Sequence, residues 1–386
     1  MALQKANEQQ GHAMEKRHIA RLGLDVSLLG FGAMRLPLLA GSKTAVDQAL
    51  AEAMIDRAIA AGVNYFDTAF IYHNGVSEII LGRILRKYPR DSFLLADKLS
   101  LWSMTTRSEA ERIFALQLRK CPVEYFDFYL LHGLKADSYA LATRLDLYGW
   151  LGEKKKQGLV RHIGFSFHDT PELFQAILDR HRWDFAQIQL NYVDWELGDA
   201  KRLYALLEER RIPAVVMGPV RGGVLADLPE KAAGLLKKAA PQASAASWAI
   251  RFAASLPGVM TVLSGMSDME QVEDNIKTMT PFRPLSEGER ETLKEAAALY
   301  LSAGDIPCTG CGYCAPCPEG VDIPGVLAVF NQRERRGFKH CYSVIPEQGR
   351  ANHCSACGEC GPRCPQHIDI PAAMREIAAC ASEGTN

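Results

Sequence analysis

The stretch "VNYFDTAFIYHNGVSEIILGRILRKY", residues 63–88, contains the repeating unit that decides the fold. Its first seven residues form a short, almost continuously apolar run, which is typical of a parallel strand buried on both faces. Residues 77–88 then place apolar side chains at helical spacing, which predicts an amphipathic helix. The stretch therefore predicts one strand followed by one helix.

The same pattern recurs along the first 280 residues, where short apolar runs alternate with longer amphipathic segments. The runs are LLGFGAM (28–34), VNYFDTA (63–69), FLLADK (93–98), FDFYLLH (126–132), VRHIGFSF (160–167), FAQIQL (185–190), PAVVMG (213–218) and VMTVLSG (259–265). Eight strands alternating with helices over about 250 residues predict a (β/α)8 TIM barrel, an α/β fold. A doubly wound open sheet is the alternative, but no G-x-G-x-x-G motif follows the first run.

Two further segments flank the repeats. "RHIARLGLDVSLL" (17–29) predicts a hairpin that closes the barrel floor. "PLSEGERETLKEAAALYL" (284–301) predicts an extra helix, because Ser286 can cap it and Glu289 follows three residues later. The expected organisation is a flexible N-terminus over 1–16, a barrel over 17–301 and a second domain over 302–386.

Composition excludes several classes of protein. The chain has 386 residues, of which 48% are hydrophobic and 23% charged, as in an ordinary globular protein. A formal net charge of −1 does not point to nucleic acid or a membrane surface as a partner. The N-terminus lacks the apolar core of a secretory signal, and no run approaches the roughly 18 apolar residues of a spanning helix. A cytoplasmic location is therefore expected.

Four ionisable residues stand at or just beyond the ends of three successive predicted strands: Asp67, Tyr72, Lys98 and His132. Chemistry in barrels of this kind collects where strands end, so these side chains are expected to meet. Lys98, held by Asp67, would stabilise the phenolate of Tyr72, which could then give or take a proton. His132 would orient a carbonyl oxygen and donate a hydrogen bond to it.

These motifs resemble those of the aldo-keto reductases. "FDTAFIYHNGVSEIILGRIL", "ADK" and "FDFYLLH" look like that family's sequence, including its Asp–Tyr–Lys–His tetrad, and the resemblance covers roughly residues 17–280. It implies reversible hydride transfer between NAD(H) or NADP(H) and a small aldehyde or ketone, sugar-like substrates included. Tyr72 would be the proton donor.

The resemblance also implies cofactor contacts. Ser166 and Gln187 match the groups that hold the carboxamide, "MGPVRGG" (217–223) the loop along the pyrophosphate, and "SGMSDMEQVEDN" (264–275) the segment around the adenosine. The full expected cofactor-binding set is Gly32, Ala33, Met34, Ser166, Gln187, Met217, Gly218, Pro219, Arg221, Gly222, Gly265, Gln271 and Asn275.

The cofactor segments depart from the family pattern. Phe167 replaces the asparagine that usually follows Ser166, so part of the carboxamide contact is either lost or passes to His168. Met217 replaces an aromatic residue that stacks on the nicotinamide, and Gly265 and Gln271 replace the cations that hold a 2′-phosphate. The preference for NADP over NAD is therefore open.

Three more residues lie beside the expected mouth of the barrel. Trp102 and His73 could line a substrate pocket, and Arg35 could hold an anionic group. Loop packing, or a solvated charge, is an equally good interpretation of each.

Ten of the eleven cysteines lie between residues 308 and 380, which marks the second domain. "CSACGECGPRCPQHIDIP" (354–371) has the C-x2-C-x2-C-x3-C-P spacing of a bacterial ferredoxin run for a [4Fe–4S] cluster, and "CTGCGYCAPCPEG" (308–320) repeats it with one residue fewer before the last cysteine. A disulfide framework would need an oxidising compartment. Zinc is the structural alternative, although zinc sites generally use pairs of C-x2-C ligands.

The doubled run resembles dicluster ferredoxins, and the long spacer between the runs resembles the helical ferredoxin domains of multi-subunit dehydrogenases. That resemblance implies that the fourth cysteine of each run binds the other cluster. The expected ligands are Cys308, Cys311, Cys314 and Cys364 for the first cluster and Cys354, Cys357, Cys360 and Cys317 for the second. Cys341 or Cys380 could replace Cys317, and Cys121 is expected to be a buried apolar residue.

A barrel followed by a dicluster tail resembles the ferredoxin-fused subgroup of aldo-keto reductases. One hypothesis is a nicotinamide-dependent carbonyl oxidoreductase whose clusters relay electrons to or from a redox protein. A second keeps the enzyme and makes the clusters structural or redox-sensing. A third is a non-catalytic electron-transfer subunit. Since hydride carries two electrons and each cluster one, a flavin in the chain or in a partner would close the gap in the first hypothesis. The substrate, the redox partner and the oligomeric state stay open.

Overall fold

The computed structural model describes residues 14–42, 44–302, 304–333 and 338–382. Most of the segment predicted to be flexible, residues 1–13, lies outside this range. The chain forms two compact units. The first comprises the residues up to Val220 together with Ala246–Arg290, and the second comprises Arg221–Ala245 and the chain from Glu291 onward.

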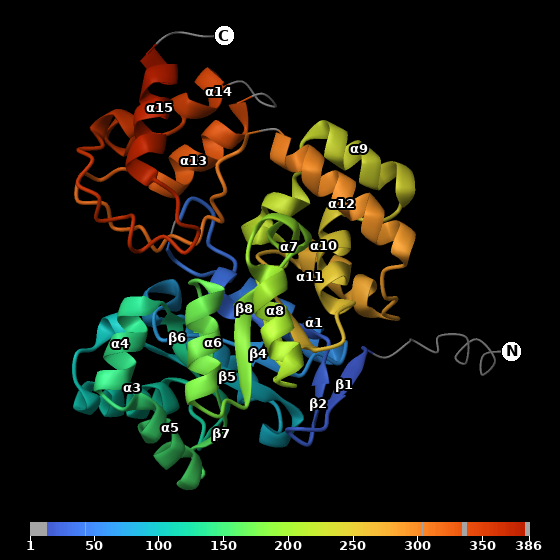
Figure 1. Cartoon of the computed structure of the whole chain (residues 1–386), viewed down its shortest axis with the longest axis vertical. Coiled ribbons are helices and arrows are strands. Elements are labelled where there is room, and N and C mark those ends of the chain that lie inside the picture. Colours follow the sequence, from blue (N-terminus) through green and yellow to red (C-terminus); the bar gives the residue numbers. More distant parts are fainter. Residues whose placement is uncertain (1–13, 43, 303, 334–337, 383–386) are drawn as a thin grey trace, which may run out of the picture. The chain divides into compact units, whose positions relative to one another are not determined.

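The first unit is a closed barrel of eight parallel strands in the order β10-β3-β4-β5-β6-β7-β8-β9 (Figure 1). The strands are β3 (Leu29–Gly32), β4 (Tyr65–Asp67), β5 (Leu94–Ser100), β6 (Phe126–Leu134), β7 (Val160–Phe167), β8 (Phe185–Gln189), β9 (Ala214–Met217) and β10 (Val259–Ser264). Each falls within one of the eight predicted apolar runs or overlaps it. The predicted (β/α)8 barrel is confirmed, and the open-sheet alternative is wrong because β10 pairs with β3 and closes the sheet.

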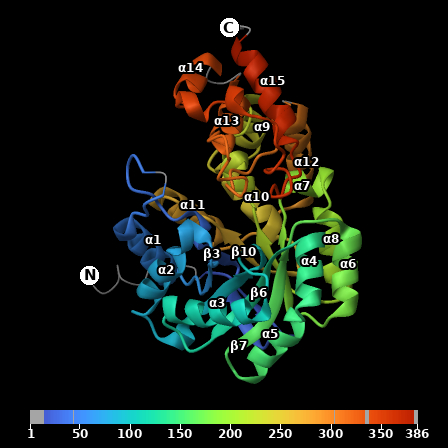
Figure 2. The same ribbon diagram turned by 90° about the vertical axis from the view of Figure 1, so that its left-hand side faces the viewer.

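Helices surround the strands, as Figure 2 shows from the side. They are α1 (Gln48–Ala60), α2 (Ser77–Leu85), α3 (Arg107–Lys120), α4 (Ala136–Arg144), α5 (Leu147–Lys156), α6 (Pro171–Arg180), α7 (Tyr192–Leu197), α8 (Ala200–Glu209), α10 (Ala245–Ala254) and α11 (Met269–Met279). Short 3-10 turns follow three strands: η1 (Ala33–Arg35), η2 (Tyr72–Gly75) and η4 (Leu101–Ser103).

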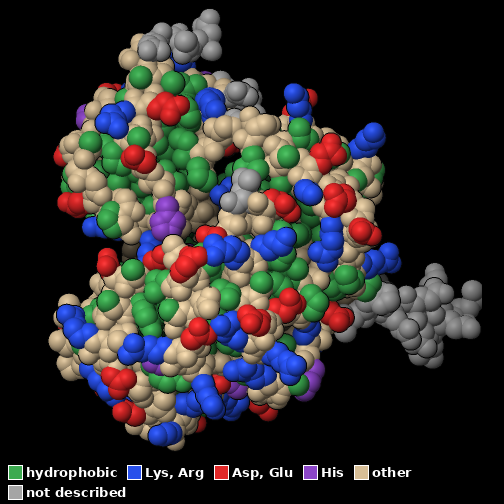
Figure 3. All heavy atoms as spheres, viewed as in Figure 1, with side chains coloured by type: hydrophobic (Ala, Val, Ile, Leu, Met, Phe, Trp, Pro, Cys, Tyr) green, Lys and Arg blue, Asp and Glu red, His purple; other side chains and the backbone are tan. Residues whose placement is uncertain are grey.

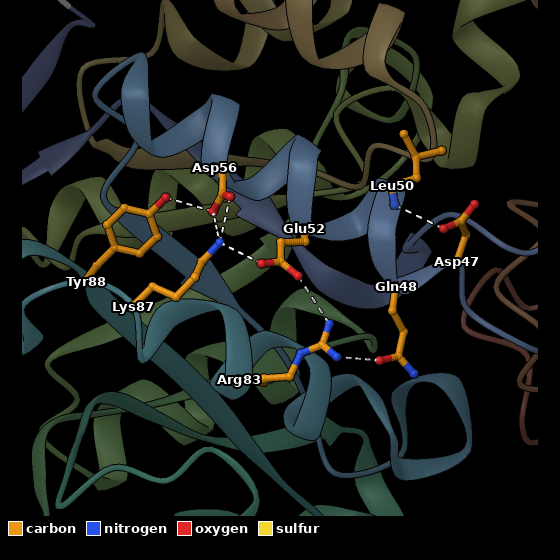
Figure 4. Close-up of polar contacts among 8 residues, drawn as sticks. All are labelled: Asp47, Gln48, Leu50, Glu52, Asp56, Arg83, Lys87 and Tyr88. Carbon is orange, nitrogen blue, oxygen red and sulfur yellow. Dashed lines mark hydrogen bonds and ion pairs between the residues drawn. The ribbon is translucent and has the colours of Figure 1, made fainter.

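Charged side chains link the outer faces of neighbouring helices. The Nζ of Lys87 lies 2.9 Å from a carboxylate oxygen of Glu52 and 2.6 Å from one of Asp56, and both acids belong to α1 (Figure 4). These side chains are each more than a third exposed, so solvent and salt weaken the pairs. Acidic and basic side chains are interspersed in the same way over the face of the molecule drawn in Figure 3.

The predicted N-terminal hairpin is confirmed and forms the barrel floor. Strands β1 (Lys16–Ile19) and β2 (Leu24–Ser27) pair antiparallel, and Val26 belongs to a buried cluster with Tyr65 and Phe128 from inside the barrel. Arg17 fastens the hairpin, since its guanidinium donates to the main-chain oxygens of Leu256 at 2.9 Å and Val259 at 2.5 Å.

Helices dominate the second unit. They are α9 (Glu230–Ala239), most of α12 (Glu287–Ser302), α13 (Ile323–Asn331), α14 (Phe338–Ser343) and α15 (Ile370–Ser382), with the 3-10 turns η5 (Arg221–Ala226), η7 (Glu347–Gly349) and η8 (Ala351–His353). The predicted helix cap is confirmed: Ser286 Oγ accepts from the main-chain N–H of Glu289 at 3.3 Å, and Glu289 Oε2 accepts from that of Ser286 at 2.8 Å.

The second unit has a small apolar core. Val326 and Phe330 of α13 pack there with Met374 and Ile377 of α15, and cysteines from both runs pack against this cluster. The expected helices between the two cysteine runs are present as α13 and α14. None of the helices in the described ranges is long and apolar enough to cross a membrane.

Barrel stability should depend on the apolar interior and little on the outer ion pairs. Phe128→Ala should lower the free energy of unfolding by about 3–5 kcal/mol, because this fully buried ring packs against Tyr65 and Phe185. Lys87→Ala should cost less than about 1 kcal/mol. Denaturant unfolding measures the free energy of unfolding of the two variants. Equal decreases in the two would contradict the prediction that the apolar interior contributes more than the outer ion pairs.

Candidate active site and cysteine cavities

The barrel brings the four predicted tetrad residues together at the carboxyl ends of its strands. Asp67 ends β4, Lys98 and His132 lie in β5 and β6, and Tyr72 begins η2 just beyond β4. The strand register places His132 beside Ser100 of β5. All four tetrad side chains are buried, with Tyr72 the most exposed at 7%.

An ion pair between Lys98 and Asp67 holds this group together. The ammonium of Lys98 lies 2.5 Å from Asp67 Oδ1 and donates to the carbonyl oxygen of Thr68 at 2.7 Å. The same nitrogen lies 4.9 Å from the centroid of the Tyr72 ring. Burial raises the pKa of Asp67, and the Lys98 ammonium opposes that shift. The arrangement therefore places a buried positive charge against the phenol ring.

His132 is held as a neutral ring. Its Nδ1 lies 3.2 Å from Ser100 Oγ, and its ring meets that of Tyr72 edge-on, with centroids 5.8 Å apart. Burial lowers the pKa of His132 well below its ordinary value, and the charges of Lys98 and His168 lower it further. Neutral imidazole can donate one hydrogen bond while accepting another.

Trp102 lies over the histidine. Its ring centroid is 4.7 Å from that of His132, and about half of the residue is exposed. A Cβ at position 133 would come within 3.0 Å of the indole, and Gly133 has φ of +64°, so a glycine there lets Trp102 pack closely. Trp102 thus lies at the tetrad, as the sequence suggested, whereas His73 accepts a hydrogen bond from the main-chain N–H of Leu36.

The expected carboxamide contacts lie on the next strands. Ser166 Oγ accepts from the main-chain N–H of Gly133 at 2.8 Å. Gln187 Nε2 lies 3.5 Å from the sulfur of Met217, at the end of β9. The Oε1 atom of Gln187 is buried and, within the described ranges, has no hydrogen-bond partner. A buried acceptor of this kind fits a ligand that brings an N–H donor.

Other expected cofactor residues surround the ends of β3, β9 and β10. Gly32 ends β3, and Ala33 and Met34 form η1. Gly218 and Pro219 follow β9 in the first unit, where Gly218 has φ of +63°. The other five expected residues are Gly265, Gln271, Asn275, Arg221 and Gly222.

These remaining residues have defined local partners. A Cβ on Gly265 would lie 3.3 Å from the side chain of Arg35. Gln271 is engaged with Ser267 and Asp268 at the start of α11, and Asn275 Nδ2 donates to Ser264 Oγ at 2.8 Å. Arg221 and Gly222 belong to η5 in the second unit, where Arg221 Nη1 lies 3.5 Å from the hydroxyl of Tyr300.

Sequence reasoning missed the polar residues that support the tetrad. Ser100 contacts His132, and Thr68 supplies its carbonyl to Lys98. Ser77 joins Thr68 to the main chain of Ala33. The signal for Ser100 was its position two residues after Lys98, which puts both side chains on one face of β5.

Two cavities in the second unit are each lined by cysteines from both runs. Cys308, Cys311 and Cys314 line one cavity together with Cys364. Cys354, Cys357 and Cys360 line the other together with Cys317, and Cys314 reaches it as well. Each run of the sequence therefore contributes its fourth cysteine to the cavity of the other run.

The shifts in the pKa values of two thiols follow the same grouping of cysteines. Burial and the neighbouring Cys311, Cys308 and Cys364 raise the pKa of Cys314 to about 12. Burial, with Cys354, Cys357 and Cys317 nearby, raises the pKa of Cys360. All eleven cysteines are free thiols, so no disulfide bond supports the disulfide alternative.

No three His, Cys, Asp or Glu side chains in the described ranges converge closely enough to hold a single metal ion. Cys341 in α14 and Cys380 in α15 line neither cavity, and Cys121 is buried in the barrel.

Comparison with known proteins assigns the barrel to a family. The model of the aldo/keto reductase family matches residues 28–298. L-galactose dehydrogenase of Arabidopsis thaliana is 28% identical over 306 residues, which cover 74% of this chain and 94% of that protein. NADH-specific methylglyoxal reductase of Escherichia coli is 24% identical over 225 residues, covering 54% of this chain and 65% of that protein.

Solved structures agree with this assignment. Aldo-keto reductase AKR11C1 of Bacillus halodurans, in its holo form, superposes with a TM-score of 0.62 at 26% identity and covers 73% of this chain and 96% of its own. The matched part corresponds to the barrel and leaves most of the cysteine-rich second unit unmatched. From the extent of the family match and the fold, the chain belongs to the aldo/keto reductase family.

Proposed function

We propose that the protein is a nicotinamide-dependent oxidoreductase that interconverts a small aldehyde or ketone and its alcohol, with two [4Fe–4S] clusters that exchange electrons with a partner protein. The observation that carries the first part is the buried Lys98–Asp67 pair against the ring of Tyr72, with neutral His132 beside it. The relatives that act on L-galactose and methylglyoxal, by their names, suggest sugar-like or small oxo substrates.

In the proposed reaction Tyr72 and His132 both act on the carbonyl oxygen, and Lys98 assists Tyr72. The Lys98 ammonium, 4.9 Å from the Tyr72 ring centroid, stabilises the phenolate and so assists Tyr72 in giving its proton to the oxygen. The proposed role needs the tautomer in which Ser100 Oγ donates to Nδ1 of His132; the proton of the neutral ring then lies on Nε2 and donates a hydrogen bond to the same oxygen. In the oxidation direction Tyr72 takes the alcohol proton back.

The residues near β7–β9 fit a nicotinamide. The unpartnered Oε1 of Gln187 can accept from a carboxamide N–H, and Ser166 lies on the adjacent strand, paired to Gln187 in the register. When bound, the nicotinamide supplies the hydride or accepts it. Trp102, half exposed over His132, offers an apolar face to the substrate and helps to exclude water.

The eight cysteines around the two cavities suit two four-iron clusters. One cavity offers three thiols from the first run and Cys364 from the second, and the other offers three from the second run with Cys317 and Cys314 from the first. In ferredoxins with two clusters, each cluster likewise takes a ligand from the other run. When present, the clusters supply one-electron transfer. A flavin in the chain or in the partner would convert between this and the two electrons of a hydride. Purely structural or redox-sensing clusters are the alternative, and a non-catalytic electron-transfer subunit is disfavoured by the assembled tetrad.

The proton-transfer role is tested by Tyr72→Phe. This variant should lower kcat for carbonyl reduction by about 10²- to 10⁴-fold, because the phenol hydroxyl transfers the proton. Nucleotide affinity should change little. Tyr88→Phe is the matched control, since its hydroxyl bonds to Asp56 on the outer surface. Steady-state kinetics with a panel of aldehydes and hydroxy sugars measures both, and wild-type turnover by Tyr72→Phe would refute the assignment.

Nucleotide preference follows from residues 265 and 271. NADH should bind at least as tightly as NADPH, because Gly265 and Gln271 cannot pair with a 2′-phosphate as cations would. Gln271→Arg should shift the ratio toward NADPH by roughly tenfold. Fluorescence titration with both nucleotides decides this. A clear NADPH preference of the unmodified protein would show that another cation binds the phosphate, and Arg35 beside Gly265 would be the first candidate.

Cluster content is the third prediction. Protein purified without oxygen should contain about eight irons and eight acid-labile sulfides. Cys364→Ser should damage the cluster at Cys308, Cys311 and Cys314, because Cys364 lines their cavity. The tail should loosen with it, because small metal-binding domains depend on the metal for folding. The barrel should still bind nucleotide.

Iron analysis and paramagnetic resonance of the reduced protein measure the outcome. Cys341→Ser is the matched control, since it lines neither cavity and should leave the iron content unchanged. Four irons in the unmodified protein would mean that one set is empty, with the shorter run at 308–317 the weaker of the two. Iron at background level would refute the cluster proposal.

A further inference from the structure

The turn that follows Tyr72 has an unusual main-chain conformation. His73 has φ of 50° and ψ of 46°, and Asn74 has φ of 55° and ψ of 34°. Gly75 continues the series with φ of 83°. Three successive residues are thus left-handed, and two of them carry side chains. Such conformations cost on the order of 1–3 kcal/mol each and persist only where surrounding contacts impose them.

His73 supplies one of these contacts. Its Nε2 accepts a hydrogen bond from the main-chain N–H of Leu36 at 3.0 Å. Burial lowers the pKa of His73, and a hydrogen bond between the ring and the main chain of Met34 opposes that shift. A neutral imidazole can accept one hydrogen bond and donate another, so the His73 side chain can contact the main chain at both ends of the segment from Met34 to Leu36.

Polar contacts of Ser77, Thr68 and Lys120 fix the same loops. Ser77 Oγ donates to the carbonyl oxygen of Ala33 at 3.0 Å and lies 2.9 Å from Thr68 Oγ1. The carbonyl oxygen of Thr68 in turn accepts from Lys98. On the other side of the turn, Lys120 donates to the carbonyl oxygen of Gly75 at 2.9 Å. The turn is therefore held at both ends, and His73 is its link to the segment after β3.

We propose that His73 is a positioning residue, which sets the phenol of Tyr72 relative to the segment 33–36 and thereby to the cofactor expected on that segment. Tyr72 directly precedes His73, and Ala33 and Met34 lie in the expected cofactor set. A shift of the turn would move the proton donor away from the reacting carbon and oxygen. A displacement of about 1 Å can cost about 10²-fold in rate. The inference rests on the proposed role of Tyr72.

Three variants of the full-length protein test the proposal. His73→Ala removes both bonds to the segment 34–36 and should lower kcat at least tenfold, with a small change in KM and in nucleotide affinity. His73→Gln should recover most of kcat, because its amide reaches the position of Nε2 and can accept from Leu36 N–H. Asn74→Ala is the matched control: it places the same alanine in the same left-handed conformation at an exposed position.

The measurements are kcat and KM with one carbonyl substrate, nucleotide affinity by fluorescence titration, and the midpoint of thermal unfolding. A positioning role predicts a fall in kcat for His73→Ala that Asn74→Ala and His73→Gln do not share. Equal losses in His73→Ala and Asn74→Ala, or a loss that follows unfolding alone, would overturn it. If Tyr72→Phe keeps wild-type turnover, the proposed function itself fails. If Tyr72→Phe is inactive while His73→Ala is not, only the present inference fails.

Discussion

The buried ion pair between Lys98 and Asp67 is the interaction on which the barrel's chemistry depends. Two charges without water are costly unless they are paired and their remaining hydrogen-bonding capacity is met. The Lys98 ammonium donates hydrogen bonds to Asp67 Oδ1 and to the Thr68 carbonyl oxygen, which meets much of its hydrogen-bonding capacity. Replacing either residue would leave the other charge buried without a partner. Because the pair is fixed, the ammonium stays against Tyr72, and its charge helps to keep His132 neutral.

Around this pair, the loops after β3 and β4 are joined by polar contacts of a different kind. Ser77 and His73 bond to main-chain atoms of residues 33–36, not to the tetrad itself. Main-chain partners cannot move independently of the fold, so such contacts transmit the rigidity of the strands to the turn that carries Tyr72. The strain at His73 and Asn74 is then compensated by the contacts on either side of the turn.

The stability of the second unit has a separate basis, because this small domain has few apolar residues. Its core relies on α13 and α15, and the cysteines pack against it. Because each cavity takes a cysteine from both runs, whatever fills one cavity also ties the first run to the second. Binding clusters there would couple the folding of the tail to its metal.

The sequence by itself predicted the barrel, the floor hairpin, the capped helix at Ser286 and the positions of the tetrad, because apolar runs, cap residues and strand ends are local patterns along the chain. The pairing of β10 with β3 then excluded the open sheet. The spacing and resemblance in the sequence also predicted which cysteines group together. Only the tertiary structure decided that His73 binds the main chain near Leu36, that Ser100 contacts His132, and that Gln187 is left with an unpaired oxygen. It also assigned Gly218 and Arg221 to different units. These facts depend on side-chain direction and on partners far away in the chain, and neither leaves a periodic signal in the sequence.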